Sequence, residues 1–305
     1  MSTVVPMSLS DSQPLSRWGI LMGLMLSAGS WLSAPAMAQG LFYAPRPNPD
    51  LTQAQGLQLA SDALRLGQFG QQEEALNRLG LAAILVPNSP EILFLLGGLH
   101  LEFENYRESL NALQIARDLD PDNVDILVTL GSAYLRQGSY FAALDVLQQA
   151  VDLGGEDAGA FFQLGNAHLM LANFDAAETA YDTALELDPN FWPALNNIGL
   201  VEYERGNLDQ AIVRFEQTIE LNGDIAEPKL GLATALFIQG ETEAAEQLGA
   251  EAIRLDISYT RLDVLRMNLW GPEMMRDVQM LLRTSSVKDA LRQATLEAID
   301  ILPGL

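Results

Sequence analysis

The chain has few side chains suited to acid–base or metal chemistry. Its only histidines are His100 and His168, and it contains no cysteine. The missing thiols exclude a disulfide framework, thiolate zinc sites and a cysteine nucleophile. The two histidines occupy the same column of an internal repeat, two units apart, which is too far for both to bind one metal ion. No Ser–His–Asp set, glycine-rich phosphate loop or HExxH motif is present, so the sequence predicts no catalytic residue, metal or cofactor.

Amide side chains offer a different chemistry, because they both donate and accept hydrogen bonds and can bind the backbone of an extended peptide. Asn166, Asn196 and Asn197 form such a set. Phe162 and Met170 stand near them and would supply apolar contact. The alternative is that the amides only bond neighbouring helices or water. Whether they share one surface depends on the elements that carry them.

Those elements belong to a repeat of 34 residues that runs without a gap from Gly56. The units are 56–89, 90–123, 124–157, 158–191, 192–225 and 226–259. The eighth position of every unit holds Gly or Ala, and the thirtieth is always Leu. Small residues at fixed helical positions let two helices approach closely, while large residues such as Leu147 fill the remaining space. In four units a glycine falls between the two helices, where a tight turn favours it: Gly70, Gly138, Gly206 and Gly240.

Each unit is therefore expected to form a helix–turn–helix whose apolar face is buried by stacking on the next unit. The pattern resembles the tetratricopeptide repeat in its period and its small-residue columns. Unit 4 matches best, through Phe161, Leu164, Gly165, Ala177, Tyr181, Ala184 and Pro189. Units 1 and 6 depart most, since Asp62 and Gly249 take positions where a large apolar residue is expected. The resemblance implies an all-α fold, a right-handed superhelical solenoid of helix–turn–helix repeats with a C-terminal helical cap.

In this family the first helix of each unit lines a concave groove. Carried over by position, the resemblance predicts an apolar lining with a central amide patch. The peptide-binding residues it implies are Phe94, Phe162, Gln163, Asn166, Met170, Asn196, Asn197, Tyr203 and Phe237. Some family members bind the acidic C-termini of chaperones through a clamp of Lys, Arg and Asn. That clamp is not expected here, because the equivalent positions, Val128 and Leu230 among them, hold no cation.

The N-terminal region resembles an export signal. Arg17 precedes the apolar run from Trp18 to Leu32, and Ala36-Met37-Ala38 is a small-x-small cleavage pattern. We therefore expect residues 1–38 to be a signal peptide, removed before Gln39, and the protein to be exported to a periplasm or a thylakoid lumen. The alternative is an uncleaved membrane anchor within residues 18–34. Residues 39–55, with alternating prolines, predict an extended linker.

Residues 260–305 lack the repeat but keep helical patterns at 261–269, 272–283 and 287–301. Their apolar side chains could cover the exposed end of unit 6, so this segment is expected to form capping helices. A separate docking site for a partner is the alternative.

The net charge of −23 lies entirely on the six units, because the flanking segments are each neutral. Such a surface argues against nucleic-acid binding, which needs a basic face. The charge either keeps the protein soluble and monomeric or steers a basic partner.

These features predict a non-enzymatic scaffold or assembly factor that binds a protein or an extended peptide in the groove. Contact with a membrane is expected only if the N-terminal segment stays uncleaved. The alternative is a membrane-anchored auxiliary subunit of an envelope enzyme or secretion complex.

Overall fold

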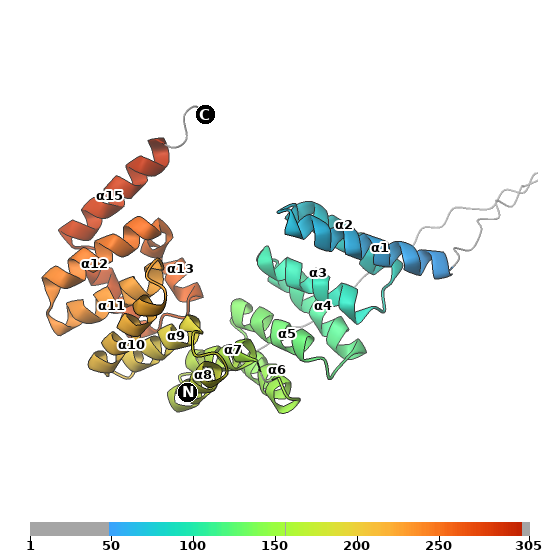
Figure 1. Ribbon diagram of the computed structural model, residues 1–305, viewed down its shortest axis with the longest axis horizontal. Coiled ribbons are helices and arrows are strands. Elements are labelled where there is room, and N and C mark those ends of the chain that lie inside the picture. Colours follow the sequence, from blue (N-terminus) through green and yellow to red (C-terminus); the bar gives the residue numbers. More distant parts are fainter. Residues whose placement is uncertain (1–48, 156, 301–305) are drawn as a thin grey trace, which may run out of the picture. The chain divides into compact units, whose positions relative to one another are not determined.

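The computed structural model describes residues 49–155 and 157–300. Over these residues it contains fifteen α-helices, one short 3-10 helix and no strand (Figure 1). Twelve helices form six consecutive pairs: α1 (Pro49–Gln68) with α2 (Gln72–Leu85), α3 (Pro90–Glu102) with α4 (Tyr106–Leu119), α5 (Val124–Gln137) with α6 (Tyr140–Asp152), α7 (Ala158–Met170) with α8 (Phe174–Leu187), α9 (Trp192–Glu204) with α10 (Leu208–Leu221), and α11 (Ala226–Gln239) with α12 (Thr242–Leu255). A 3-10 helix (Ile257–Thr260) then leads to α13 (Leu262–Met267), α14 (Pro272–Leu281) and α15 (Ser285–Asp300).

The helix pairs follow the repeat register. Helices α3, α5, α7, α9 and α11 each begin at the first residue of a predicted unit. Three of these helices have an N-cap side chain that accepts a hydrogen bond from the backbone N–H three residues later. The capping side chains are those of Ser89, Asn123 and Asp157. Each pair packs on the next, and successive first helices also contact one another from α3 to α11. The expected all-α solenoid of helix–turn–helix repeats with a C-terminal helical cap is confirmed.

The first helix starts earlier than the sequence suggested. Residues 49–55 were expected to belong to an extended linker, but α1 begins at Pro49. Proline suits the first position of a helix, because the N–H it lacks would have no intrahelical partner there. The expected signal peptide, its cleavage pattern and the rest of the linker lie outside the described residues. Among the described helices, none is long and apolar enough to cross a membrane.

The small residues of the eighth column allow the two helices of a unit to touch. A Cβ added at Gly165 would lie 2.5 Å from the ring of Tyr181, and one added at Gly199 would lie 2.7 Å from the ring of Phe215. Both rings are fully buried. The large side chain of one helix therefore fills the space that glycine leaves on the other.

The turn between paired helices is left-handed in every unit. Gly70, Gly138, Gly206 and Gly240 have φ values between 73° and 102°, as expected for glycine at a tight turn. Units 2 and 4 place Glu104 and Ala172 at the same position, with φ of 59° and 55°. These two residues adopt a conformation that costs a non-glycine residue about 1–2 kcal/mol.

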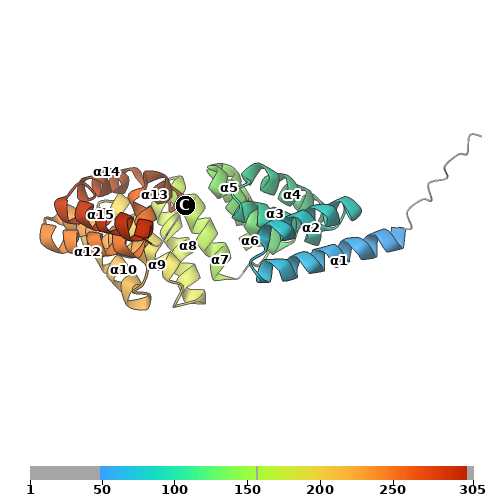
Figure 2. The same ribbon diagram turned by 90° about the horizontal axis from the view of Figure 1, so that it is seen from above.

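The C-terminal segment packs on two sides of units 5 and 6. Helix α15 lies along α12 (Figure 2). Helix α14 contacts α9 and α11, the first helices of these units. Met274, Val278 and Leu281 of α14 are fully buried in the same core as Tyr181 and Phe215. The segment is therefore an integral part of the fold, on the first helices as well as at the end of unit 6.

Candidate functional site

A cavity of about 470 Å³ lies over the first helices of units 3 to 6. It gathers five of the predicted binding residues: Phe162, Gln163, Asn166, Asn196 and Asn197. Aromatic walls come from Phe162, Tyr140 and Trp192. Asp263 and residues 266–269, from α13 and the turn after it, also line the cavity. We call this space the amide cavity.

The amides of the cavity are held by bonds between helices. Asn166 Oδ1 accepts hydrogen bonds from the Tyr181 hydroxyl and from Asn197 Nδ2, both at 2.8 Å. Asn166 Nδ2 donates to Gln163 Oε1 at 3.0 Å. The network joins α7, α8 and α9, and Asn166 is only 5% exposed. The amides thus bridge neighbouring helices and also line the cavity.

A buried carboxylate extends the network towards the C-terminal segment. Asn196 Nδ2 donates to Asn197 Oδ1 at 3.2 Å and to Glu227 Oε1 at 3.3 Å. Trp270 Nε1 donates to the same Glu227 oxygen at 3.2 Å, and the Tyr259 hydroxyl donates to Glu227 Oε2 at 3.4 Å. Burial raises the pKa of Glu227 to about 7, and the hydrogen bonds from its neighbours partly oppose that rise. Glu227 therefore fastens the C-terminal segment to the amide patch.

Helix α14 occupies the part of the first helices where Tyr203 was expected to meet a peptide. The Tyr203 hydroxyl donates to Asp277 Oδ2 at 2.9 Å. Glu204 accepts from the backbone N–H groups of Met274, at 2.9 Å, and Glu273, at 3.3 Å, at the start of α14. A Cβ at Gly271 would lie 2.2 Å from Glu204 Cδ, so a side chain there would displace the Glu204 carboxylate from the start of α14.

The other predicted residues lie apart from the amide cavity. Phe94 lines a second cavity of about 360 Å³ between α1 and α3, with mostly apolar neighbours such as Leu64 and Leu95. Phe237 is half-buried and packs against the core. Met170 is half-buried at the end of α7 and lines neither cavity in the part of the chain that the structure describes. Five of the nine predicted residues thus share the amide cavity, and the other four lie elsewhere.

Sequence reasoning missed Glu227 and the C-terminal lining. Glu227 is the second residue of its unit, where units 2 and 3 also carry an acid, and acids are common in a first helical turn. Nothing local marks it as buried. A signal for the segment did exist in Gly249, which stands where a large apolar residue was expected. Val287 and Leu281 fill that space, at 3.3 and 3.4 Å from a Cβ placed there.

The histidines do not form a site within residues 49–155 and 157–300. Both rings are half-buried, and the Nδ1 atoms of His100 and His168 have no hydrogen-bond partner among these residues. Burial lowers the pKa of each ring. In the same residues no group of three or more His, Asp or Glu side chains could hold a metal ion.

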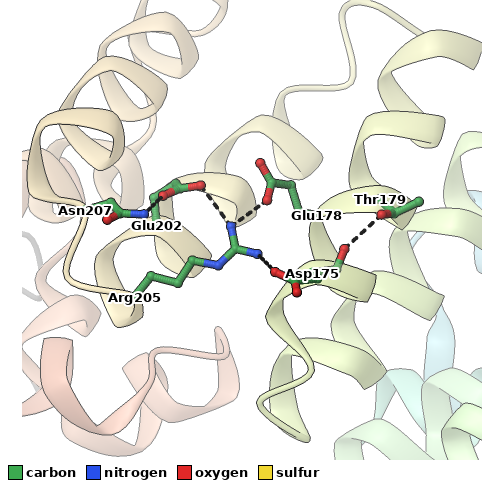
Figure 3. A network of polar contacts seen from close by, with 6 residues as sticks. All are labelled: Asp175, Glu178, Thr179, Glu202, Arg205 and Asn207. Carbon is green, nitrogen blue, oxygen red and sulfur yellow. Dashed lines mark hydrogen bonds and ion pairs between the residues drawn. The ribbon is translucent and has the colours of Figure 1, made fainter.

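Part of the acidic charge is neutralised between units 4 and 5. Arg205 follows α9 and reaches back to α8, where its guanidinium pairs with Asp175 at 2.6 Å and with Glu178 (Figure 3). The same group lies 3.1 Å from Glu202, whose side chain is 4% exposed and also accepts a bond from Asn207. One arginine thus pairs with three carboxylates at the contact between two units.

Comparisons with known proteins agree with this architecture. A family model described as tetratricopeptide repeat matches residues 94–159, 162–220 and 206–259, more than half of the chain. Among curated proteins, no sequence matches the chain.

Several solved structures share the fold. PilW, described as a widely conserved type IV pilus biogenesis factor, is 15% identical and covers 67% of this chain and 94% of its own, with a TM-score of 0.61. MamA from Desulfovibrio magneticus RS-1, residues 41 to the end, is 24% identical, covering 55% and 94% at a TM-score of 0.51. TTC0263, a thermophilic TPR protein of Thermus thermophilus, is 21% identical, covering 60% and 99% at a TM-score of 0.50. Such identities bear on the fold alone.

Proposed function

Because the chain belongs to the tetratricopeptide repeat family, we propose that it is a non-enzymatic scaffold or assembly factor that binds a protein or an extended peptide along its first helices. The family and the fold support a protein-interaction role in general terms. The proposed site is the amide cavity, where donors, acceptors and aromatic rings converge on one open space.

The single observation that carries this proposal is the composition of the amide cavity. Its volume falls in the range of about 300–1,000 Å³ that is typical of ligand sites, and its walls combine Phe162 and Trp192 with fixed amides. Because Asn166, Asn196 and Asn197 bond one another, their orientation is set before a ligand arrives. A ligand that meets fixed groups loses less free energy to ordering the site.

The test should avoid Asn166 and Asn196, since replacing them would break the network that holds the helices. Gln163 and Trp192 are better probes because both are only half-buried. A partner is first captured from the native envelope with the full chain. Trp192→Ala with Gln163→Ala should then weaken its binding about 30-fold or more, since an aromatic residue at the centre of an interface contributes about 2 kcal/mol. Isothermal titration measures the affinity.

A matched control also removes one aromatic residue and one glutamine, but away from the cavity. Phe141 is 79% exposed on α6, and Gln148 is exposed on the same helix. Phe141→Ala with Gln148→Ala should bind like the parent. Circular dichroism must show equal helix content in all three proteins. If the control loses affinity and the cavity variant keeps it, the binding site lies on the second helices and the proposal is wrong.

We also propose export, on the strength of the apolar run at residues 18–34 and the pattern Ala36-Met37-Ala38. Intact-mass measurement of the native protein should give a chain that starts at Gln39. A chain that retains Met1 or Ser2 would instead favour the second candidate, a membrane-anchored auxiliary subunit of an envelope enzyme or secretion complex.

A basic partner is proposed from the charge alone, since the units carry the whole net charge of −23. Association with such a partner should slow as salt rises, because screening shortens to about 8 Å at 0.15 M. Association rates that do not change with salt would leave solubility as the role of the charge.

A further inference from the structure

Two arginines at the amide cavity have no counter-charge. Arg136 lies in the last turn of α5, and Arg266 lies on α13. Both line the cavity and both are exposed. Neither side chain makes a hydrogen bond or an ion pair with any residue in 49–155 or 157–300. Acids outnumber bases by 40 to 17 in this chain. Most of the other arginines form an ion pair with an acidic side chain: Arg65, Arg78, Arg107, Arg117, Arg205, Arg261, Arg276 and Arg292.

The acids of the cavity do not neutralise these two arginines. Asp263 pairs with Arg261, which lies two residues before it in the chain. Glu227 is fully buried and directs its oxygens to Asn196, Trp270 and Tyr259. Its pKa of about 7 also leaves it partly protonated near neutral pH. The cavity therefore presents positive charge on a protein that is otherwise strongly negative.

The surroundings favour a group that accepts several hydrogen bonds. A guanidinium offers five N–H donors in a planar fork that matches a carboxylate. Two cations that line one cavity raise its positive potential, and an anion bound there is attracted by both. Next to the cavity, α14 covers α9 and α11. A bound peptide that follows the first helices from α5 therefore meets α13 and Arg266 at the cavity.

We propose that the amide cavity binds a carboxylate group of a partner peptide, with Arg136 and Arg266 as its counter-charges. The amides and the aromatic walls then contact the residues beside that group. This inference rests on the proposed function and names the chemistry that its site recognises. Arg136 stands at the end of its helix and Arg266 lies outside the repeats, so neither occupies the positions considered for a clamp in the sequence. The remaining negative surface can still attract a partner that is basic elsewhere.

The test uses the immobilised full chain and three pools of N-acetylated octapeptides of random sequence. The first pool has a free C-terminus and no Asp or Glu. The second is the same pool with its C-terminus amidated. The third is amidated but carries one Glu in each peptide. Mass spectrometry measures retention. At least one carboxylate-bearing pool should be retained about 10-fold more than the neutral pool, since a hydrogen bond to a charged group contributes at least that factor. The first and third pools separate a terminal carboxylate from a side-chain carboxylate.

Two double variants locate the effect. Arg136→Gln with Arg266→Gln should abolish the preference for carboxylates. Arg254→Gln with Arg283→Gln removes two other exposed arginines that have no partner among the described residues and do not line the cavity, and it should keep the preference. Equal retention of all pools by the parent would overturn the inference, and so would a preference that survives Arg136→Gln with Arg266→Gln. In either case retained peptides would leave the proposed function standing. If no pool is retained, peptide binding fails and both conclusions fall.

Discussion

Replacing Gly165 with Ala tests a close contact between the two helices of unit 4. The new Cβ would lie 2.5 Å from Tyr181 Cε1, whereas carbon atoms in contact are about 3.5–4.0 Å apart. The ring would have to retreat by about 1 Å. It is fully buried, and its hydroxyl donates to Asn166 at 2.8 Å. The substitution therefore strains the core and the floor of the amide cavity together.

The expected magnitude follows from three terms. Overpacking costs about 1–3 kcal/mol, and a weakened Tyr181–Asn166 bond costs about 1 kcal/mol. Replacing glycine by alanine inside a helix returns about 1 kcal/mol. The net loss of about 2 kcal/mol should lower the melting temperature by about 4–8 °C. Thermal unfolding followed by circular dichroism measures it.

Gly98 provides the matched control. It lies inside α3, one residue after the eighth column, and a Cβ added there has no atom within 4 Å. Gly98→Ala should therefore raise the melting temperature, because only the helix-propensity term remains. The reasoning is refuted if Gly165→Ala stabilises the protein as much as Gly98→Ala does.

Three further predictions test other features. Ala172→Gly, at φ of 55°, should stabilise the fold by about 0.5–1 kcal/mol, while Gly138→Ala, at φ of 84°, should cost about 1–2 kcal/mol; thermal melts of both that move the same way would contradict this. Because burial raises the pKa of Glu227 from 4.5 to about 7, the native state holds a proton that the unfolded chain releases. The free energy of unfolding should therefore fall by about 3 kcal/mol as pH rises from below 4.5 to above 7, and urea titrations across this range should show the fall disappear in Glu227→Gln. Arg205→Gln should lower stability by about 1–3 kcal/mol in the same assay, because it leaves the buried Glu202 carboxylate beside two other acids; an unchanged midpoint would show that the ion pairs are not needed.

The repeats were predictable from the sequence because the same types of residue recur at the same positions from unit to unit. The helix starts, the glycine turns and the contact at Gly165 all follow from columns whose members share one environment. The position of the C-terminal segment follows from no column, since it contacts residues of units 5 and 6 from outside the repeat. Its apolar side chains were expected to cover the end of unit 6, but its contacts with α9 and α11 were not expected. Gly249 marks one of its contacts, as a missing side chain whose space Val287 and Leu281 fill.

The candidate site was also predictable only where it follows from the repeat. The inward face of α7 and α9 follows from the register, so Asn166 and Asn196 were expected on one surface, and both line the amide cavity. Their bonding partners were not predictable, because Glu227 becomes buried only when Trp270 and Tyr259 pack over it. A surface made by elements distant in the chain is beyond the reach of a local pattern.

The packing of α14 on α9 also sets an order for folding during synthesis. Contacts between neighbouring units join residues about one repeat apart, but the Tyr203–Asp277 bond spans 74 residues. At about 5–20 residues per second, a ribosome needs roughly 4–15 seconds to make that stretch. Units 1 to 3 can stack as they emerge, whereas α9 and α11 stay uncovered until residues 272–281 have left the exit tunnel. We therefore expect nascent chains that stop near residue 260 to expose the apolar side of these helices and to be the species that chaperones bind.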